Sequence, residues 1–160
     1  MIGILRARSG YSYQDAVCTP MQLAERAAEL GHTHLGVTDA GSVMGAVELQ
    51  KACSAKGLQP IFGATLRVLD ELTDPPGNVP VDLVPRAGFL VQVLVEDEEG
   101  WAALGGLLTE ASQRLHYGPT LSLAQLLQLE DRGVSLLVGG RRGPSSRDLD
   151  VLHRVFGDDH

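Results

Sequence analysis

Cysteine and aromatic residues are scarce in this 160-residue sequence, which holds two cysteines and 4% aromatic residues. Cys18 and Cys53 lack the CxxC spacing of zinc and redox motifs, and two isolated cysteines do not make a disulfide framework. We therefore expect two buried thiols in a reducing cytoplasm. No segment approaches the roughly 20 apolar residues of a membrane helix, and no apolar signal-peptide region follows Arg6 and Arg8. The sequence thus predicts a cytoplasmic protein without a membrane anchor.

Positive charge is also in short supply. The 13 lysine and arginine residues face 20 aspartate and glutamate residues, and the formal net charge is −7. Because phosphate contacts need clustered lysine and arginine, we expect no strong autonomous binding of nucleic acid. Hydrophobic residues make up 44% and charged residues 21% of the sequence, as in folded globular domains. The length suits a single domain over residues 1–160.

Short apolar segments alternate with amphipathic ones along the chain. The pattern predicts strands at residues 2–7, 34–38, 60–69, 89–95 and 134–139, and helices at residues 20–30, 42–56, 96–114, 122–129 and 146–156. Thr19 and Pro20 suit the start of the first helix, and Gly31 suits its end. Residues 70–88 hold four prolines and read as a loop. This alternation predicts an α/β fold with parallel strands.

Reactive groups of parallel α/β folds lie just beyond the C-terminal ends of the strands. In this sequence those positions hold Arg6, Arg8, Ser9, Asp39, Ala40, Gly41, Thr65, Glu96, Asp97 and residues 139–142. None of the five histidines lies at such a position, although a hydrolytic metal centre needs several histidine and carboxylate ligands. No nucleophile elbow, P-loop or GxGxxG pattern is present. We therefore predict no catalytic residue, no metal and no cofactor.

Five short motifs follow one another in the order found in a known family. Residues 6–16 (RARSGYSYQDA) resemble HxHSxYSxxDG, residues 37–53 resemble LTDHG…GAVEFYKAC, and residues 57–65 resemble GIxPIxGxE. Residues 98–107 resemble NEEGYxNLxxL, and residues 139–143 resemble SGCxxG. Over roughly residues 2–143 the chain thus resembles the PHP (polymerase and histidinol phosphatase) domain of bacterial DNA polymerase III alpha subunits. Residues 62–63, residues 74–77 and the Arg-Arg-Gly turn resemble the error-prone branch.

The resemblance implies a partial, distorted (β/α) barrel of PHP type, with about five parallel strands and flanking helices. It also implies where the family's metal-dependent phosphoesterase or 3′–5′ exonuclease site would lie. The former metal-site positions are Arg6, Arg8, Asp15, Ala40, Thr65, Leu90 and Gly140. Of these, only Asp15 retains a metal-binding side chain, and two guanidinium groups repel cations. We therefore expect a catalytically inactive domain with a structural or assembly role in DNA replication or repair.

Two alternatives stay open at this point. Arg6, Arg8, Arg141 and Arg142 are candidates for an anion- or nucleotide-binding site, because arginine pairs bidentately with phosphate. Against this, Arg6 and Arg8 are expected to pair simply with Asp15 and Asp39. The other alternative is a residual metal-dependent phosphoesterase. Since a partial barrel leaves sheet edges exposed, we expect a homo-oligomer or docking onto a DNA polymerase subunit.

Overall fold

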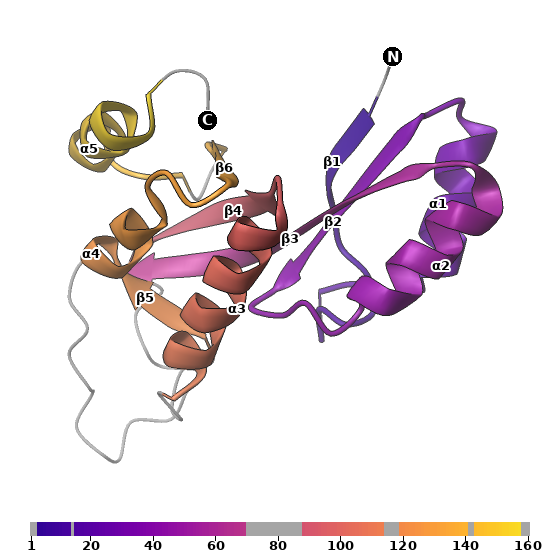
Figure 1. Ribbon diagram of the computed structural model, residues 1–160, viewed down its shortest axis with the longest axis horizontal. Coiled ribbons are helices and arrows are strands. Elements are labelled where there is room, and N and C mark those ends of the chain that lie inside the picture. The colour runs from indigo at the N-terminus through magenta and orange to yellow at the C-terminus, as the bar shows by residue number, and fades with distance from the viewer. Residues whose placement is uncertain (1–2, 14, 70–87, 114–118, 141–142, 158–160) are drawn as a thin grey trace.

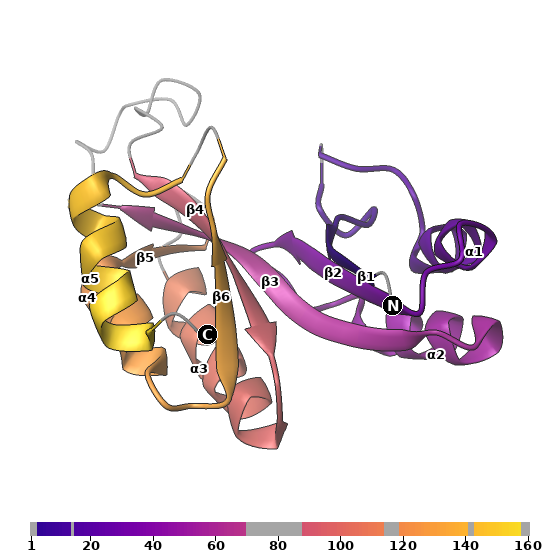
Figure 2. The ribbon, with the colours of Figure 1, turned by 90° about the horizontal axis from the view of Figure 1, so that it is seen from above.

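The computed structural model describes residues 3–13, 15–69, 88–113, 119–140 and 143–157. Within these residues, one curled sheet is flanked by helices (Figures 1 and 2). The strands are β1 (Gly3–Ala7), β2 (His34–Ala40), β3 (Gln59–Leu69), β4 (Phe89–Val95), β5 (Thr120–Ser122) and β6 (Val134–Val138). The helices are α1 (Pro20–Glu29), α2 (Ala46–Lys56), α3 (Glu98–Ser112), α4 (Leu123–Leu126), the 3-10 helix η2 (Leu127–Leu129) and α5 (Ser146–Phe156).

The order of strands across the sheet is β1-β2-β3-β4-β6, and β5 pairs with the end of β3. The expected partial, distorted α/β barrel is confirmed, but the expectation that its strands are all parallel is wrong. β1, β2, β3 and β5 pair in parallel, whereas β4 runs antiparallel to β3 and β6. A parallel return needs a crossover connection, usually a helix. The sequence between β3 and β4 is rich in proline and has no helical pattern, so β4 returns in the opposite direction.

Helix boundaries follow the capping residues. Thr19 and Gln22 form a capping box at the start of α1, and Gly31 adopts the predicted left-handed conformation just after that helix (φ 75°). α5 has the predicted bounds, with Ser145 as its N-cap. The second helix was expected to start at residue 42, but α2 begins only at Ala46, because residues 41–45 form a loop between β2 and the helix. The sequence pattern also missed β5, which is only three residues long.

The hydrophobic residues form two clusters rather than one. The first lies between α1, α2 and the first strands, and contains Ala24, Ala27, Leu35, Val37, Leu49, Ala52, Cys53 and Leu58. The second is larger and is built by β3–β6 with α3, α4, η2 and α5. β3 contributes to both, with Phe62 against the first cluster and Leu66 in the second. Figures 1 and 2 show the result, two lobes joined by β3.

The two cysteines have different surroundings. Cys53 belongs to the first cluster, and burial raises the pKa of its thiol. Cys18 is exposed, so the expectation of two buried thiols is wrong for this residue. It lies in the loop before α1 and belongs to neither hydrophobic cluster. Among the described residues, no helix is long and apolar enough to cross a membrane.

The sheet face opposite the two clusters carries a strip of buried polar side chains. Thr38 pairs with Gly63, Ala40 pairs with Thr65, and Thr65 pairs with Gln92, so these residues share one face. Thr38, Thr65 and Gln92 are all at least 96% buried. The Thr65 hydroxyl donates to the main-chain oxygen of Thr38 at 2.8 Å. The hydroxyl of Thr38 has no hydrogen-bond partner within the described part of the chain.

Replacing Thr38 with valine is expected to stabilise the protein by about 1 kcal/mol, because a buried hydroxyl without a partner costs free energy and a methyl group does not. Thr65→Val is the matched control. It removes a hydrogen bond that is present and should destabilise the protein by about 1 kcal/mol. Urea unfolding measures both free energies. A Thr38→Val variant that is less stable than the parent would show that the hydroxyl has a partner in solution.

Candidate functional site

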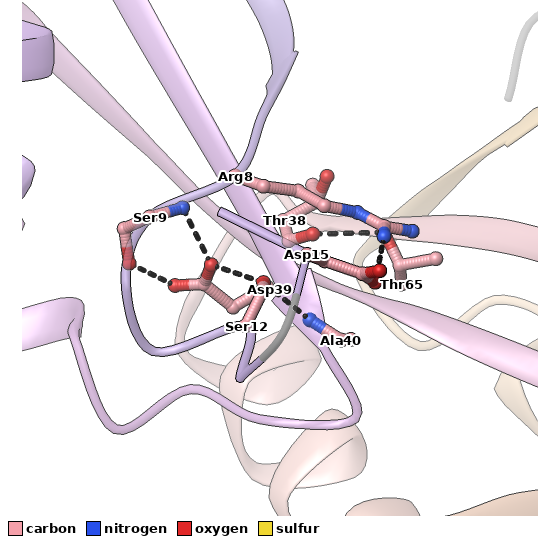
Figure 3. A network of polar contacts seen from close by, with 8 residues as sticks. All are labelled: Arg8, Ser9, Ser12, Asp15, Thr38, Asp39, Ala40 and Thr65. Atoms are coloured by element: carbon pink, nitrogen blue, oxygen red, sulfur yellow. Dashed lines mark hydrogen bonds and ion pairs between the residues drawn. The ribbon is translucent and has the colours of Figure 1, made fainter. Parts of the chain in front are cut away.

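The C-terminal ends of β1, β2 and β3 meet at one edge of the sheet, because these three strands are parallel. Ala40 at the end of β2 lies beside Thr65 of β3, and the main-chain N–H of Gly41 donates to the oxygen of Thr65 at 2.8 Å. The segment after β1 brings Arg8 to the same place (Figure 3). Four of the former metal-site positions, Arg8, Asp15, Ala40 and Thr65, therefore lie in one region of the structure.

Asp39 is the buried centre of this region, with 3% of its surface exposed. Its carboxylate accepts hydrogen bonds from the main-chain N–H of Ser9 (2.7 Å), the hydroxyl of Ser9 (2.7 Å) and the hydroxyl of Ser12 (2.6 Å). The Ser12 oxygen in turn accepts from the N–H of Ala40 at 3.0 Å. Figure 3 shows this network fastening the loop after β1 to the end of β2. The sequence predicted an arginine as the partner of Asp39, but the donors to its carboxylate are instead hydroxyl and amide groups.

Arg8 forms an ion pair with Asp15. The side chains are 26% and 52% exposed, respectively, so the pair lies at the mouth of the site rather than inside it. Figure 3 shows the guanidinium group of Arg8 reaching across Thr38 toward Asp15 and Thr65. The expected pairing of Arg8 with Asp15 is thus confirmed. The positive charge of Arg8 lies at a former ligand position, and it engages Asp15, the carboxylate that the resemblance left as a ligand.

Arg6 follows a different course and stays exposed on β1. One of its terminal nitrogens, Nη1, lies 4.0 Å from the point that a Cβ on Gly140 would occupy. Arg6 therefore reaches the turn after β6. Within the described residues it has no ion-pair partner. The other two arginines proposed for an anion site, Arg141 and Arg142, lie outside the described residues.

The remaining former metal-site positions lie on other elements. Leu90 is on β4 opposite Arg67 of β3, two positions along the ladder from the Thr65–Gln92 pair. Gly140 is exposed after β6 and has a positive φ of 78°. Neither offers a side chain that binds metal. Their positions and those of Arg6, Arg8 and Ala40 carry no oxygen, nitrogen or sulfur ligand suited to a cation.

The residues present do not fit a divalent metal. No group of three or more histidine, cysteine, aspartate or glutamate side chains in the described ranges could hold an ion. Asp15 is paired with Arg8, and Asp39 already accepts three hydrogen bonds. A structural zinc site needs four ligands, and an oxygen-ligated magnesium or calcium site needs about six. We therefore derive no chemistry through a metal ion.

The loop after β1 also contacts α2, and this contact was not predicted. The hydroxyl of Tyr11 donates to Oε2 of Glu48 at 3.0 Å, and this hydrogen bond raises the pKa of Tyr11 above its usual value. A Cβ on Gly45 would lie 2.7 Å from the Tyr11 ring, so glycine leaves room for the tyrosine. The signal in the sequence was the motif itself, with Tyr11 and Ser12 in one part and Gly45 and Glu48 in the other. Spacing along the chain did not show that these residues touch.

Substitution of Asp39 with alanine is expected to destabilise the protein by at least about 3 kcal/mol, because three buried donors on Ser9 and Ser12 lose their acceptor. The matched control is Asp15→Ala. It removes a carboxylate that is half exposed, and it should cost less than about 1 kcal/mol. Urea unfolding followed by circular dichroism gives both values. Equal losses for the two variants would contradict the anchoring role of Asp39.

Comparisons with known proteins agree with this geometry. The sequence pattern of the PHP domain matches residues 5–152. The DNA polymerase III subunit alpha of Escherichia coli K12 is 32% identical over 147 residues, which cover 91% of this chain and 12% of that polymerase. The error-prone DNA polymerase of Mycobacterium tuberculosis is 39% identical over 157 residues, covering 96% of this chain and 11% of the polymerase. The chain therefore spans about an eighth or less of these relatives.

A solved structure supports the fold. A crystal structure described as a metal-dependent phosphoesterase from Bifidobacterium adolescentis superposes with a TM-score of 0.63, covering 95% of this chain and 73% of that protein. The sequence identity is 14%, so this likeness concerns the fold alone. Taken with the ordered motifs and the convergence of their residues at the ends of β1, β2 and β3, these matches show that the chain belongs to the PHP domain family, as a relative of the PHP regions of DNA polymerase III alpha subunits and error-prone DNA polymerases.

Proposed function

We propose that the chain is a catalytically inactive PHP domain with a structural or assembly role beside a protein of the DNA polymerase III alpha type, in DNA replication or repair in the cytoplasm. The observation that carries this proposal is the ion pair between Arg8 and Asp15. It puts a permanent cation at a former ligand position and engages the one carboxylate left among those positions. A site of this kind repels the metal ions on which the family's phosphoesterase chemistry depends.

The contrast between framework and site supports the same proposal. The Asp39 network, the capped helices and both hydrophobic clusters are intact. Fold and activity make separate demands on a sequence, because activity depends on a few side chains at the site. A domain that keeps the framework and replaces the ligands is suited to contacts with other proteins. It is not suited to hydrolysis.

The edges of the sheet support a role in assembly. Within the described residues, β1 pairs only with β2, and β6 pairs only with β4. Leu5 on β1 is 41% exposed, and Val138 at the end of β6 is 36% exposed. Free strand edges with apolar side chains favour pairing with another chain. The partner is either a second copy of this chain or a DNA polymerase subunit.

Loss of catalysis predicts that the purified chain holds less than one zinc or manganese ion and does not hydrolyse a chromogenic phosphodiester when manganese is added. Elemental analysis and an absorbance assay measure these quantities, with a metal-binding PHP phosphoesterase as the positive control. A chelator should leave the unfolding temperature unchanged, because the framework is held by hydrogen bonds to Asp39. One metal ion per chain together with hydrolysis would instead establish a residual phosphoesterase.

The assembly role predicts association in solution. Size-exclusion chromatography with light scattering should give the mass of an oligomer, or a complex when the alpha-type polymerase subunit of the same organism is added. Either result follows from the free edges of β1 and β6. A chain that stays monomeric at high concentration and elutes apart from the polymerase would refute this part of the proposal. The metal and hydrolysis assays would be unaffected by that outcome.

A further inference from the structure

Two arginines extend the sheet face that carries the buried polar strip. Ala7 pairs with Val37 and packs against the first hydrophobic cluster. Its neighbours Arg6 and Arg8 therefore project from the opposite face, because successive side chains of an extended segment alternate. Thr38 lies on that opposite face, and Figure 3 shows the side chain of Arg8 passing over it. We call Arg8 and Thr38 together the Arg8–Thr38 site.

Hydrogen-bond donors outnumber acceptors at the Arg8–Thr38 site. The hydroxyl of Thr38 is buried and has no partner among the residues that the structure describes. A guanidinium group carries several N–H donors. Arg8 uses only one terminal nitrogen, Nη1, in its bond to Asp15, as far as the described ranges show. A buried polar group without a partner is costly and rare, and a missing ion is one of the recognised reasons for it. An anion would supply the acceptors that both side chains lack.

The charges around the site favour an anion, although the chain as a whole is acidic. Arg6 lies on the same face and has no ion-pair partner within the described part of the chain. Arg67, farther along β3, lies on this face as well and has a partner of its own. Two carboxylates are near. Asp39 already accepts three hydrogen bonds, and Asp15 is paired with Arg8.

Asp15 occupies the place on Arg8 that an oxygen of a ligand would take. Its side chain is 52% exposed, and that of Arg8 is 26% exposed. Ion pairs with this degree of exposure contribute little free energy, because water screens them. An anion that offers more acceptor oxygens than one carboxylate, and that also meets the hydroxyl of Thr38, is therefore able to displace Asp15. The ion pair keeps the guanidinium group in position until a ligand arrives.

We propose that the Arg8–Thr38 site binds the phosphate group of a small molecule, which replaces Asp15 as the partner of the guanidinium group. When Arg8 turns toward the phosphate, the hydroxyl of Thr38 is uncovered and donates to a phosphate oxygen. Phosphate matches the planar fork of arginine and accepts two parallel hydrogen bonds from it. Arg6 adds attraction from a greater distance. No bond is made or broken, and no metal ion is needed.

The ligand is small rather than a nucleic acid. The chain has a net charge of −7, which opposes the approach of a long polyanion. A single phosphate group meets only the local charge of Arg6 and Arg8. Free phosphate and a mononucleotide share this chemistry. Binding of either one goes beyond the proposed assembly role and does not depend on it.

The probes for this proposal are inorganic phosphate and dAMP. Each is titrated into the full chain in chloride buffer with a chelator present, at constant ionic strength. Both should raise the unfolding temperature and shift the NMR signal of the Arg8 side-chain N–H in a saturable manner, because a ligand that binds only the folded chain stabilises it. Saturation by dAMP alone would assign the site to nucleotides. Saturation by neither probe would overturn the proposal.

Thr38→Val separates a binding role of the hydroxyl from a structural one. In chloride buffer this variant is expected to be more stable than the parent, because it lacks a buried donor without a partner. It should nevertheless bind phosphate about fivefold more weakly, the loss of one hydrogen bond to the ligand. The two effects have opposite signs, and a purely structural role would not produce the second. Phosphate affinity equal to that of the parent would contradict the proposal.

Asp15→Asn tests whether the ion pair competes with the ligand. It should bind phosphate about fivefold more tightly, since Arg8 is no longer neutralised. Arg26 and Glu29 form an exposed ion pair of the same kind on α1, so Glu29→Gln is the matched control and should not change the affinity. Arg8→Leu should abolish saturable binding, with circular dichroism as the check on folding. Equal gains for Asp15→Asn and Glu29→Gln would show unspecific attraction and exclude the site.

The phosphate titrations and the association measurements fail independently. A chain that forms an oligomer or a complex with the polymerase subunit but gives no saturable phosphate binding keeps the assembly role and lacks this site. A chain that binds phosphate in the presence of the chelator has the site, whatever its oligomeric state is. Binding that disappears with the chelator would instead indicate a bound metal ion and would overturn the proposal.

Discussion

The hydrogen bonds of the buried Asp39 carboxylate fix the arrangement on which the rest of the site depends. Ser9 and Ser12 donate to this carboxylate, and they thereby hold the loop after β1 against the end of β2. The same loop brings Arg8 to Asp15 and Tyr11 to Glu48 of α2. A buried charge is tolerated only when it is well supplied with donors. Here neutral hydroxyl and amide groups supply them, so the framework requires no cation.

Because the Asp39 network needs no cation, a member of this family can have its metal ligands replaced and still keep its fold. If Asp39 were satisfied by a metal or by an arginine, replacing the neighbouring ligands would leave a buried negative charge without partners. Because its partners come from the loop itself, substitutions at Arg8, Ala40 and Thr65 leave the network intact. Arg8 lies outside it and is balanced by Asp15 near the surface. The site can therefore change its charge while the strands around it keep their register.

Local patterns predicted the local structure well. Thr19 and Gly31 were identified from capping preferences and mark true helix boundaries, because a cap is decided by a few adjacent residues. The direction of β4 and the three-residue strand β5 were missed, since pairing depends on distant residues. Of the seven motif positions, four (Arg8, Asp15, Ala40 and Thr65) lie together at the strand ends. They did not predict that serines rather than arginines satisfy Asp39, because donors with the right reach were available on both.

The small recess between α2 and α3 could not be predicted from the sequence, because it depends on how two helices far apart in the chain are placed. Each helix has an apolar stripe that fills its own cluster, so the sequence of either helix looks complete. Only the passage of β3 from one lobe to the other sets the two helices apart and leaves Trp101 against Phe62 at the surface. The same long strand that carries Thr65 at the site thus sets α2 and α3 apart, and the small recess between them is lined by Asp39 as well as by Phe62 and Trp101. None of the former ligand positions lines this recess, so their substitution leaves the packing of Trp101 on Phe62 unchanged.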